Sequence, residues 1–321
     1  MNYSHTIVVC SKDRLQELFE FIDHISQIDN YLEIEIVIVE NSNTEANYEL
    51  VKKKIMSQTN AANIRIVRCT PGLANSRNKS FSFISSDIVH FLDDDVILPR
   101  NYILEVDAKF VKYPDIAGLS PYIEVDSDNS RESVYKKMLF NLFAKFQPEG
   151  KLTKSGHAFW LNRTRDDRFV NWLPGCCMVY RFDDVKSLRF DIRLELGPLG
   201  GYALGEDLDF SHRVSKEFTL LAAGSISVIH KLAQNERTNW LKMDEGIGRL
   251  RAYLLVRFPK DLSLAHIFLS LIAEGFYDLT LKRKTRTTSF DKKRAYFIQL
   301  KSFLSERKIP LISKPFELHE N

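Results

Sequence analysis

Cysteine is scarce in this 321-residue sequence, and its four copies lack the two-residue spacing of a zinc site. They are Cys10, Cys69, Cys176 and Cys177. The last two are adjacent and cannot form an ordinary disulfide with each other. We therefore expect reduced thiols and a cytoplasmic location.

Long hydrophobic runs are also lacking. The longest apolar stretch, residues 262–273, is too short to cross a bilayer and contains His266. The first ten residues have neither a basic segment nor a long apolar core, so we expect no signal peptide. A net charge of +3 gives no reason to expect nucleic acid as a partner.

Charge is unevenly distributed along the chain. Residues 236–321 hold 17 Lys and Arg against 10 Asp and Glu, whereas the rest holds 28 against 32. A basic tail on an acidic body favours contact with an anionic membrane surface, with the protein peripheral on the inner face of the membrane. A basic helix face that is simply solvated explains the same composition.

Short apolar runs alternate with helical patterns over the first 120 residues. Strands are predicted at residues 6–10, 34–39, 64–67 and 88–92, and helices at 15–25, 48–55 and 74–83. This alternation predicts an α/β fold, Rossmann-like, with a mostly parallel central sheet and helices on both faces. Ligands bind at the carboxyl ends of such strands.

The pattern changes along the rest of the chain. Residues 126–171 are less regular, with a helical stretch at 134–146, and order resumes at 172–180 and in a strand-like run at 225–229. We expect a catalytic domain over residues 1–235, divided into halves at about residue 120. A helical basic extension is expected over residues 236–321.

Three consecutive acids, Asp93, Asp94 and Asp95, follow the strand predicted at 88–92. In an extended backbone Asp93 and Asp95 point to the same side and Asp94 to the other. Carboxylate oxygens suit Mg²⁺ or Mn²⁺, and a metal that also holds diphosphate needs only one or two of them. A solvated acidic turn is the alternative interpretation.

A second polar cluster is Gly205 followed by Glu206, Asp207 and Asp209. Acids at a helix start are favoured by the helix dipole, and one of them is also a candidate general base. His230 closes the strand-like run at 225–229 and is either a ligand or an ordinary core or surface residue.

Two tryptophans lie near this second cluster. Trp160, in a polar loop, is a candidate for stacking on an acceptor sugar, and Trp172 is a candidate either for the same role or for the core.

Five segments, in order over residues 5–235, make the chain similar to the family-2 inverting glycosyltransferases with the GT-A fold, particularly the bacterial polysaccharide-assembly members. The segments are TIVVCSKDR, IVIVENSNTE, PGLANSRN, FLDDDV with its D-x-D pattern, and WLPGCCMVYR followed by GYALGEDLDFSHRV and VIH. The resemblance implies transfer of a sugar from a nucleoside diphosphate sugar to a glycan or lipid-linked acceptor. It favours a uridine diphosphate sugar as the donor, with thymidine or guanosine as the alternatives.

The resemblance also implies residue roles. Ser11, Glu40, Arg77, Asp93 and Asp94 would contact the nucleotide. Asp95 and His230 would bind Mn²⁺ or Mg²⁺, and Asp207 would be the general base. Trp160, Trp172 and Glu206 would face the acceptor.

Two residues differ from the family pattern, and two alternative functions remain to be weighed. Glu40 stands where the family usually has Asp, and Ser80 where many members have Gly. A sugar-phosphate nucleotidyltransferase is the first rival, but its usual glycine-rich loop after the first strand is missing here. A non-catalytic nucleotide-sugar-binding protein is the second, and the presence of Asp95 and Asp207 argues against it.

Overall fold

The computed structural model describes residues 2–42, 44–58, 63–125, 150–158, 165–195, 204–231 and 240–280. The chain divides into two compact units. The first comprises Met1–Asp126, Trp160–Ile192 and Glu206–Ala233, and the second Ser127–Phe159, Arg193–Gly205 and Gln234–Asn321. Two segments upstream of residue 235 thus group with the C-terminal part of the chain.

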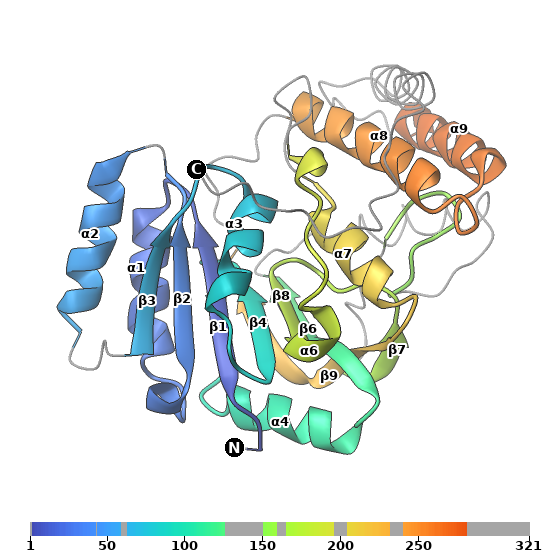
Figure 1. Ribbon diagram of the computed structural model, residues 1–321. Helices are drawn as coiled ribbons and strands as arrows, with labels where there is room; N and C mark the ends of the chain where they lie inside the picture. Colours follow the sequence, from blue (N-terminus) through green and yellow to red (C-terminus); the bar gives the residue numbers. More distant parts are fainter. Residues whose placement is uncertain are drawn as a thin grey trace. The chain divides into compact units, whose positions relative to one another are not determined.

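The first four strands confirm the alternation seen in the sequence. They are β1 (His5–Ser11), β2 (Glu35–Glu40), β3 (Ile64–Arg68) and β4 (Ile88–Leu92), and they pair in parallel in the order β3-β2-β1-β4 (Figure 1). All five residues of β4 are buried, because both faces of the sheet are covered.

The later strands make the sheet mixed. They are β5 (Val96–Ile97), β6 (Ile116–Val125), β7 (Arg168–Val170), β8 (Cys177–Arg181) and β9 (Thr219–His230). β8 lies antiparallel between β4 and β6, and β6 runs parallel to β9. β9 also pairs antiparallel with β5 and β7, so the run expected at 225–229 is the end of a longer strand.

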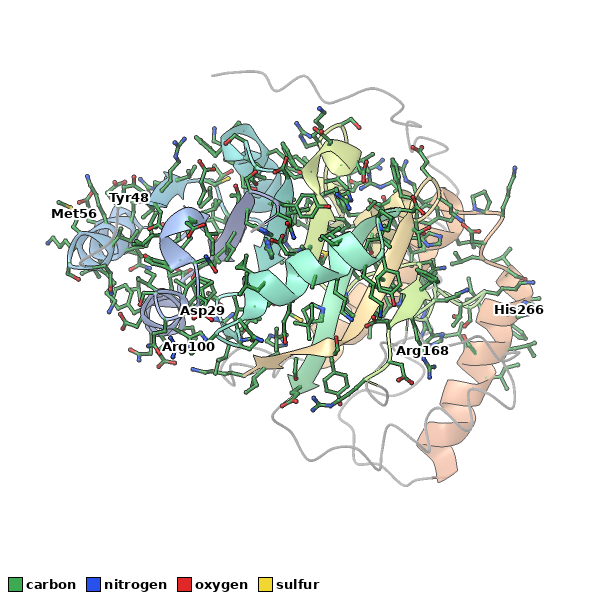
Figure 2. The ribbon with its side chains drawn as sticks, turned by 90° about the horizontal axis from the view of Figure 1, so that it is seen from below. Asp29, Tyr48, Met56, Arg100, Arg168 and His266 are labelled. Carbon is green, nitrogen blue, oxygen red and sulfur yellow. The ribbon has the colours of Figure 1, made fainter. Side chains whose placement is uncertain are left out.

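Helices cover both faces of this sheet (Figure 1). α1 (Leu15–Ile25), α2 (Glu45–Met56) and α4 (Tyr102–Lys112) pack on one face, and α3 (Leu73–Ser80), α6 (Phe182–Val185) and α7 (Glu206–Val214) on the other. An ion pair between Asp29 and Arg100, seen from below in Figure 2, joins the loop after α1 to the approach to α4.

The second unit contains α8 (Trp240–Arg257) and α9 (Leu264–Thr280). Neither these nor any other helix in the described part of the chain is long and apolar enough to cross a membrane. The helix expected at 134–146 and the basic runs at 282–286 and 292–294 lie outside the described residues.

A chain of buried polar groups crosses the core beside β1 and β4. His5 bonds Asp107 of α4 through Nε2 (2.9 Å) and His90 through Nδ1 (2.9 Å), and His90 Nδ1 lies 3.1 Å from the Tyr102 hydroxyl. Asp107 is an acceptor when ionised, so the His5 proton lies on Nε2 and His90 donates from Nε2 to His5. Burial lowers the pKa of both histidines, which favours these neutral forms.

Neutral buried histidines are expected to make the protein less stable in mild acid. The unfolded chain takes up their protons near pH 6.5 and the folded one does not, so the free energy of unfolding falls as pH drops below that value. Each histidine can lower the free energy of unfolding by at most about 1.4 kcal/mol for each pH unit. Asp94 and Asp207, whose pKa values burial raises to about 7, act in the opposite direction.

The decisive measurement is therefore the difference between the wild type and His90→Gln in melting temperature from pH 7.5 to 5. Gln stays neutral and can both donate and accept. We expect the wild type to lose more stability over this range than the variant. Parallel curves for the two proteins would contradict the prediction, and His24→Gln serves as the control at a histidine outside the chain of buried groups.

Candidate functional site

The strand ends singled out in the sequence lie at one edge of the sheet. β1, β2 and β4 are parallel, so Ser11, Glu40 and Asp93 stand at or just beyond their carboxyl ends. Ser11 and Glu40 are direct partners in the register of β1 and β2. This edge is where an open parallel sheet binds its ligands.

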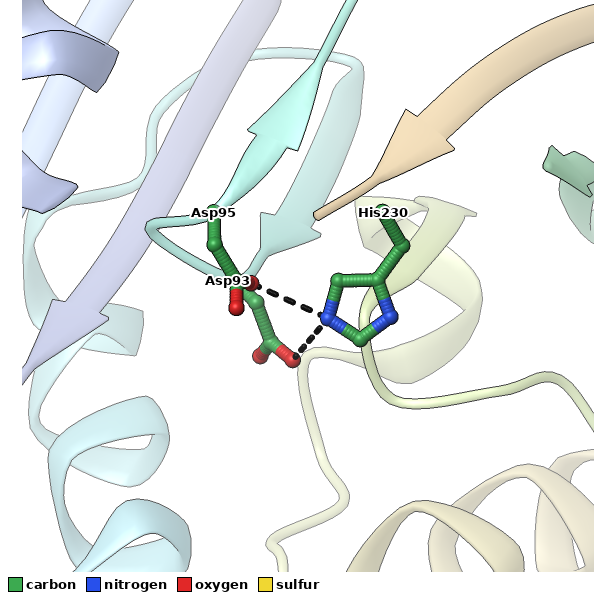
Figure 3. Close-up of side chains that lie close together, drawn as sticks. All are labelled: Asp93, Asp95 and His230. Atoms are coloured by element: carbon green, nitrogen blue, oxygen red, sulfur yellow. Dashed lines mark ion pairs between the residues drawn. The ribbon is translucent and has the colours of Figure 1, made fainter. Parts of the chain in front are cut away.

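Strand pairing brings His230 to the acidic turn at residues 93–95. β5 follows the turn and pairs with the end of β9, with Val96 opposite His230. The Nε2 atom of His230 lies 3.0 Å from an Asp95 carboxylate oxygen and 3.8 Å from one of Asp93 (Figure 3). A histidine that is isolated in the sequence is thus next to two acids in space.

These three side chains fit a divalent metal. Each offers one ligand atom, and the three atoms lie within 4.8 Å of one another. Carboxylate and imidazole ligands suit a divalent metal such as Mn²⁺ or Mg²⁺. Burial raises the pKa of Asp93 despite the opposing effects of Arg77 and His230, and a bound cation would favour its charged form.

Asp94 lies in a turn and has other partners than His230. Its Oδ2 accepts a hydrogen bond from the Ser11 hydroxyl (2.6 Å), and its Oδ1 lies 2.7 Å from Nη1 of Arg14. Burial raises the pKa of Asp94 to about 7, against the effects of Arg14 and Ser11. Ser11 and Asp94 therefore form one polar cluster at the end of β1.

Arg14 is a candidate that the sequence analysis missed. Its guanidinium bridges Asp94 and Asp95, with Nη2 2.8 Å from an Asp95 oxygen. A cation thus already neutralises part of the acidic turn. The only signal in the sequence is a basic residue shortly after the first strand, and spacing alone does not show that it faces residues 93–95.

Glu40 and Asn41 bring unsatisfied acceptors to the end of β2. Glu40 is 2% exposed, and its Oε1 accepts from the Ser42 backbone N–H (3.0 Å). Glu40 Oε2 and Asn41 Oδ1 are buried with no hydrogen-bond partner among the described residues. A buried acceptor without a donor is costly, so a ligand N–H or O–H at this point would be favourable.

Arg77 lies beneath the acidic turn rather than at the surface. It is 2% exposed, and Nη1 donates to Glu206 (2.9 Å) while Nη2 donates to the Gly175 carbonyl (2.9 Å). Nη2 also lies 3.6 Å from Asp93. The resemblance implies a nucleotide contact for Arg77 and an acceptor contact for Glu206, whereas in the structure these two residues bind each other.

Asp207 lies in the first turn of α7 and is half-buried. Its Oδ2 accepts from the Gly175 N–H (2.7 Å) and its Oδ1 from the Leu208 N–H (2.8 Å). Burial first, and then the neighbouring Glu206, raise its pKa to about 7, against the effect of Arg77. A carboxylate with a pKa near neutrality is suited to accept a proton at physiological pH.

The remaining candidates are less accessible or lie outside the described residues. Asp209 is fully buried and pairs with Arg213 one turn later in α7 (2.8 Å), which marks it as structural. Trp172 is 8% exposed, which leaves little of its ring to stack on a sugar. Trp160 lies outside the described residues.

A protein-family model matches the first half of the chain. Residues 6–170 match the family described as glycosyl transferase family 2. A search of curated protein sequences finds no match.

Solved structures share the fold at low sequence identity. The mannosyltransferase PcManGT from Pyrobaculum calidifontis, in complex with GDP-Man and Mn²⁺, is 14% identical, with a TM-score of 0.53 over 97% of this chain and 77% of that one. TarS 1–349 of S. aureus, in complex with UDP-GlcNAc, is 13% identical, with a TM-score of 0.56 over 94% and 81%. GalNAc-T7 with UDP, GalNAc and Mn²⁺ is 13% identical, with a TM-score of 0.56 over 95% and 56%.

The family match covers more than half of the chain, and the solved structures share the arrangement of its sheet. The chain belongs to glycosyl transferase family 2 and is a glycosyltransferase with the GT-A fold.

Proposed function

We propose that this glycosyltransferase is metal-dependent and inverting, and that it moves a sugar from a nucleoside diphosphate sugar to an acceptor hydroxyl. The observation that carries the proposal is the group of Asp93, Asp95 and His230 at the carboxyl edge of the sheet. Support comes from similar structures, one of which is a complex with GDP-Man and Mn²⁺ and another with UDP-GlcNAc.

Asp93, Asp95 and His230 would hold the metal. When bound, a divalent cation stabilises the negative charge that develops on a leaving diphosphate. Mn²⁺ suits a set of ligands that includes an imidazole better than Mg²⁺ does. The Arg14 guanidinium, which contacts Asp94 and Asp95, adds positive charge to the same turn.

The nucleoside would lie over the ends of β1 and β2, beside Ser11, Glu40 and Asp94. The unpaired oxygens of Glu40 and Asn41 are acceptors that suit the ring N–H of uracil, thymine or guanine. Glutamate reaches one methylene further than the aspartate usual in the family, which alters the position of the base relative to the strand end.

Asp207 would act as the general base. An acceptor hydroxyl is a weak nucleophile, so a carboxylate must take its proton while the oxygen attacks the anomeric carbon. Each Asp207 oxygen already accepts one backbone N–H and keeps a further lone pair. A single base that activates the acceptor gives inversion, because the acceptor attacks the face opposite the leaving group.

Thermal stabilisation by nucleotide sugars tests this function. A ligand present at a hundred times its Kd stabilises the native state by about 2.7 kcal/mol, which raises the melting temperature by several degrees. We expect this shift with one nucleoside diphosphate sugar in the presence of Mn²⁺, and its loss in EDTA. Absence of any shift across uridine, thymidine and guanosine sugars would contradict the proposal.

The product identifies the reaction class. A glycosyltransferase releases a nucleoside diphosphate, whereas a nucleotidyltransferase releases pyrophosphate from a nucleoside triphosphate and a sugar phosphate. Binding without either product is the outcome expected of a non-catalytic nucleotide-sugar-binding protein.

We further propose that the C-terminal extension meets an anionic membrane surface on the cytoplasmic side, close to lipid-linked acceptors of polysaccharide assembly. α9 has an apolar solvent-facing side, on which Leu264, Phe268, Leu269 and Ile272 are 56%, 57%, 41% and 44% exposed. In the sequence the basic run at 282–286 follows this helix directly. Exposed apolar groups next to basic ones are typical of proteins that lie on the surface of a bilayer.

Vesicle co-sedimentation tests the membrane contact. We expect binding to anionic vesicles but not to neutral ones, and weaker binding in high salt. Each basic residue contributes about 1 kcal/mol, so Lys282→Gln, Arg283→Gln, Lys284→Gln and Arg286→Gln together should lower affinity by roughly two to three orders of magnitude. Phe268→Ser should weaken binding without any change in charge.

Two results would overturn this second proposal. One is equal sedimentation with neutral and anionic vesicles, or none with either. The other is a concentration-dependent dimer that Phe268→Ser dissociates, since the apolar face would then join two copies of the chain.

A further inference from the structure

One turn of backbone lies between the proposed base and the acidic turn. Gly175 donates its N–H to Asp207 (2.7 Å), and the carbonyl of the next residue, Cys176, accepts from the Asp93 N–H (3.1 Å). A Cβ atom on Gly175 would come within 3.0 Å of Asp207 Oδ2, so the absence of a side chain lets the base approach the turn this closely. The positions of Asp93 and Asp207 thus depend on the same two residues.

A single buried side chain holds this turn from beneath. The Arg77 Nη2 atom donates to the Gly175 carbonyl (2.9 Å), while the Gly175 N–H binds Asp207. Nη2 also lies 3.6 Å from Asp93, and Nη1 binds Glu206, the residue before the base. The guanidinium stacks over Phe190, with its central carbon 5.3 Å from the ring centroid. Its fixed planar fork therefore connects α3, the Gly175 turn and the start of α7.

We propose that Arg77 is a positioning residue, which fixes the Gly175 turn and through it the carboxylate of Asp207, and that Glu206 is the counter-ion of Arg77. This inference rests on the proposed function and changes two roles that the family resemblance implies. Arg77 is 2% exposed and donates to Glu206 and to the Gly175 carbonyl, so the protein holds its guanidinium beneath the surface. The buried carboxylate of Glu206 forms an ion pair with Arg77, and we assign it this role in place of an acceptor contact.

The charges of this pair also act on the base. Arg77 lowers the pKa of Asp207 and Glu206 raises it, with burial as the largest cause of its upward shift. In the described part of the chain, the Cys176 thiol and the Tyr180 hydroxyl also interact with Asp207, and burial raises the pKa of both, so they stay neutral near pH 7. Removal of the Arg77 charge therefore raises the pKa of Asp207, and removal of the Glu206 charge lowers it.

The pH profile of kcat distinguishes positioning from nucleotide contact. Asp207 must be ionised to act, so kcat rises with pH through its pKa. We expect Arg77→Met to move this rise to higher pH and Glu206→Gln to move it to lower pH, each by about one pH unit, or roughly tenfold in kcat on the acid side. The KM for the donor should stay within a few-fold of the wild-type value in both variants.

Three further variants separate this role from a loss of stability. Arg77→Lys keeps the positive charge but loses the planar set of guanidinium N–H donors. Its kcat should therefore fall, while the pH at which kcat rises should not change. Arg77→Met combined with Glu206→Gln leaves no unpaired buried charge and covers the case in which Arg77→Met alone does not fold. Arg213→Lys, at the other buried arginine pair of α7, is the matched control and should change stability without moving the profile.

The result that overturns the inference is a large rise in donor KM for Arg77→Met with an unmoved pH profile. If the wild type transfers no sugar, the proposed function fails instead. NMR titration of the Asp207 carboxyl carbon then still tests the coupling, because the opposite shifts in Arg77→Met and Glu206→Gln do not require turnover.

Discussion

Asp207→Asn is expected to lower kcat by roughly two to four orders of magnitude, the usual contribution of a general base, while donor affinity stays within a few-fold of wild type. The amide cannot take a proton from an acceptor hydroxyl. It retains one oxygen acceptor for the two backbone N–H groups of Gly175 and Leu208, so one hydrogen bond is lost, at about 1 kcal/mol of stability. The helix start should survive this loss.

The pH dependence of the wild type tests the same assignment. Because burial and Glu206 raise the pKa of Asp207 to about 7, kcat should fall about tenfold for each pH unit below that value. Steady-state kinetics of donor consumption, at saturating acceptor and Mn²⁺, gives both quantities. Asp209→Asn is the control, since Asp209 is fully buried and paired with Arg213. If the turnover of Asp207→Asn stays within a few-fold of wild type, Asp207 is not the general base and serves only as an acid at the start of the helix.

Much of this architecture could be predicted because it depends on local patterns. The apolar runs at 6–10 and 88–92 are short and nearly continuous, as strands buried on both faces are, and the structure places β1 and β4 there. The convergence of Ser11, Glu40 and Asp93 follows from parallel strands alone. The alternation of side chains expected for Asp93, Asp94 and Asp95 does not apply, because residues 94 and 95 lie in a turn and Arg14 contacts both carboxylates.

Other parts of the site depend on pairings between distant segments, which spacing does not reveal. His230 reaches the acidic turn because two-residue β5 pairs with the end of β9, a register that no local pattern encodes. The Arg77–Glu206 pair joins residues 129 positions apart. Family resemblance implied a role for each residue separately, but not that the two bind each other.

Asp95→Ala is expected to abolish the metal dependence of nucleotide binding and to leave the fold intact. Asp95 is the buried carboxylate of the metal group that lies nearest to His230, at 3.0 Å, whereas Asp93 lies at 3.8 Å. Its removal takes away one of the three ligand atoms and leaves only the carboxylate that lies farther from His230, so the protein would hold the diphosphate-bound Mn²⁺ more weakly. Arg14 keeps its ion pair with Asp94, so the turn retains a charged partner.

Isothermal titration of a nucleoside diphosphate with and without Mn²⁺ measures this effect directly. The wild type should bind more tightly with the metal, and Asp95→Ala should bind equally weakly in both conditions. Asp94→Asn is the matched comparison in the same turn: Asp94 faces Ser11 and Arg14 rather than His230, so this variant should keep a difference between the two titrations. An Asp95→Ala protein with undiminished Mn²⁺-dependent affinity would place the metal elsewhere, and the acidic turn would then be a charged loop neutralised by Arg14.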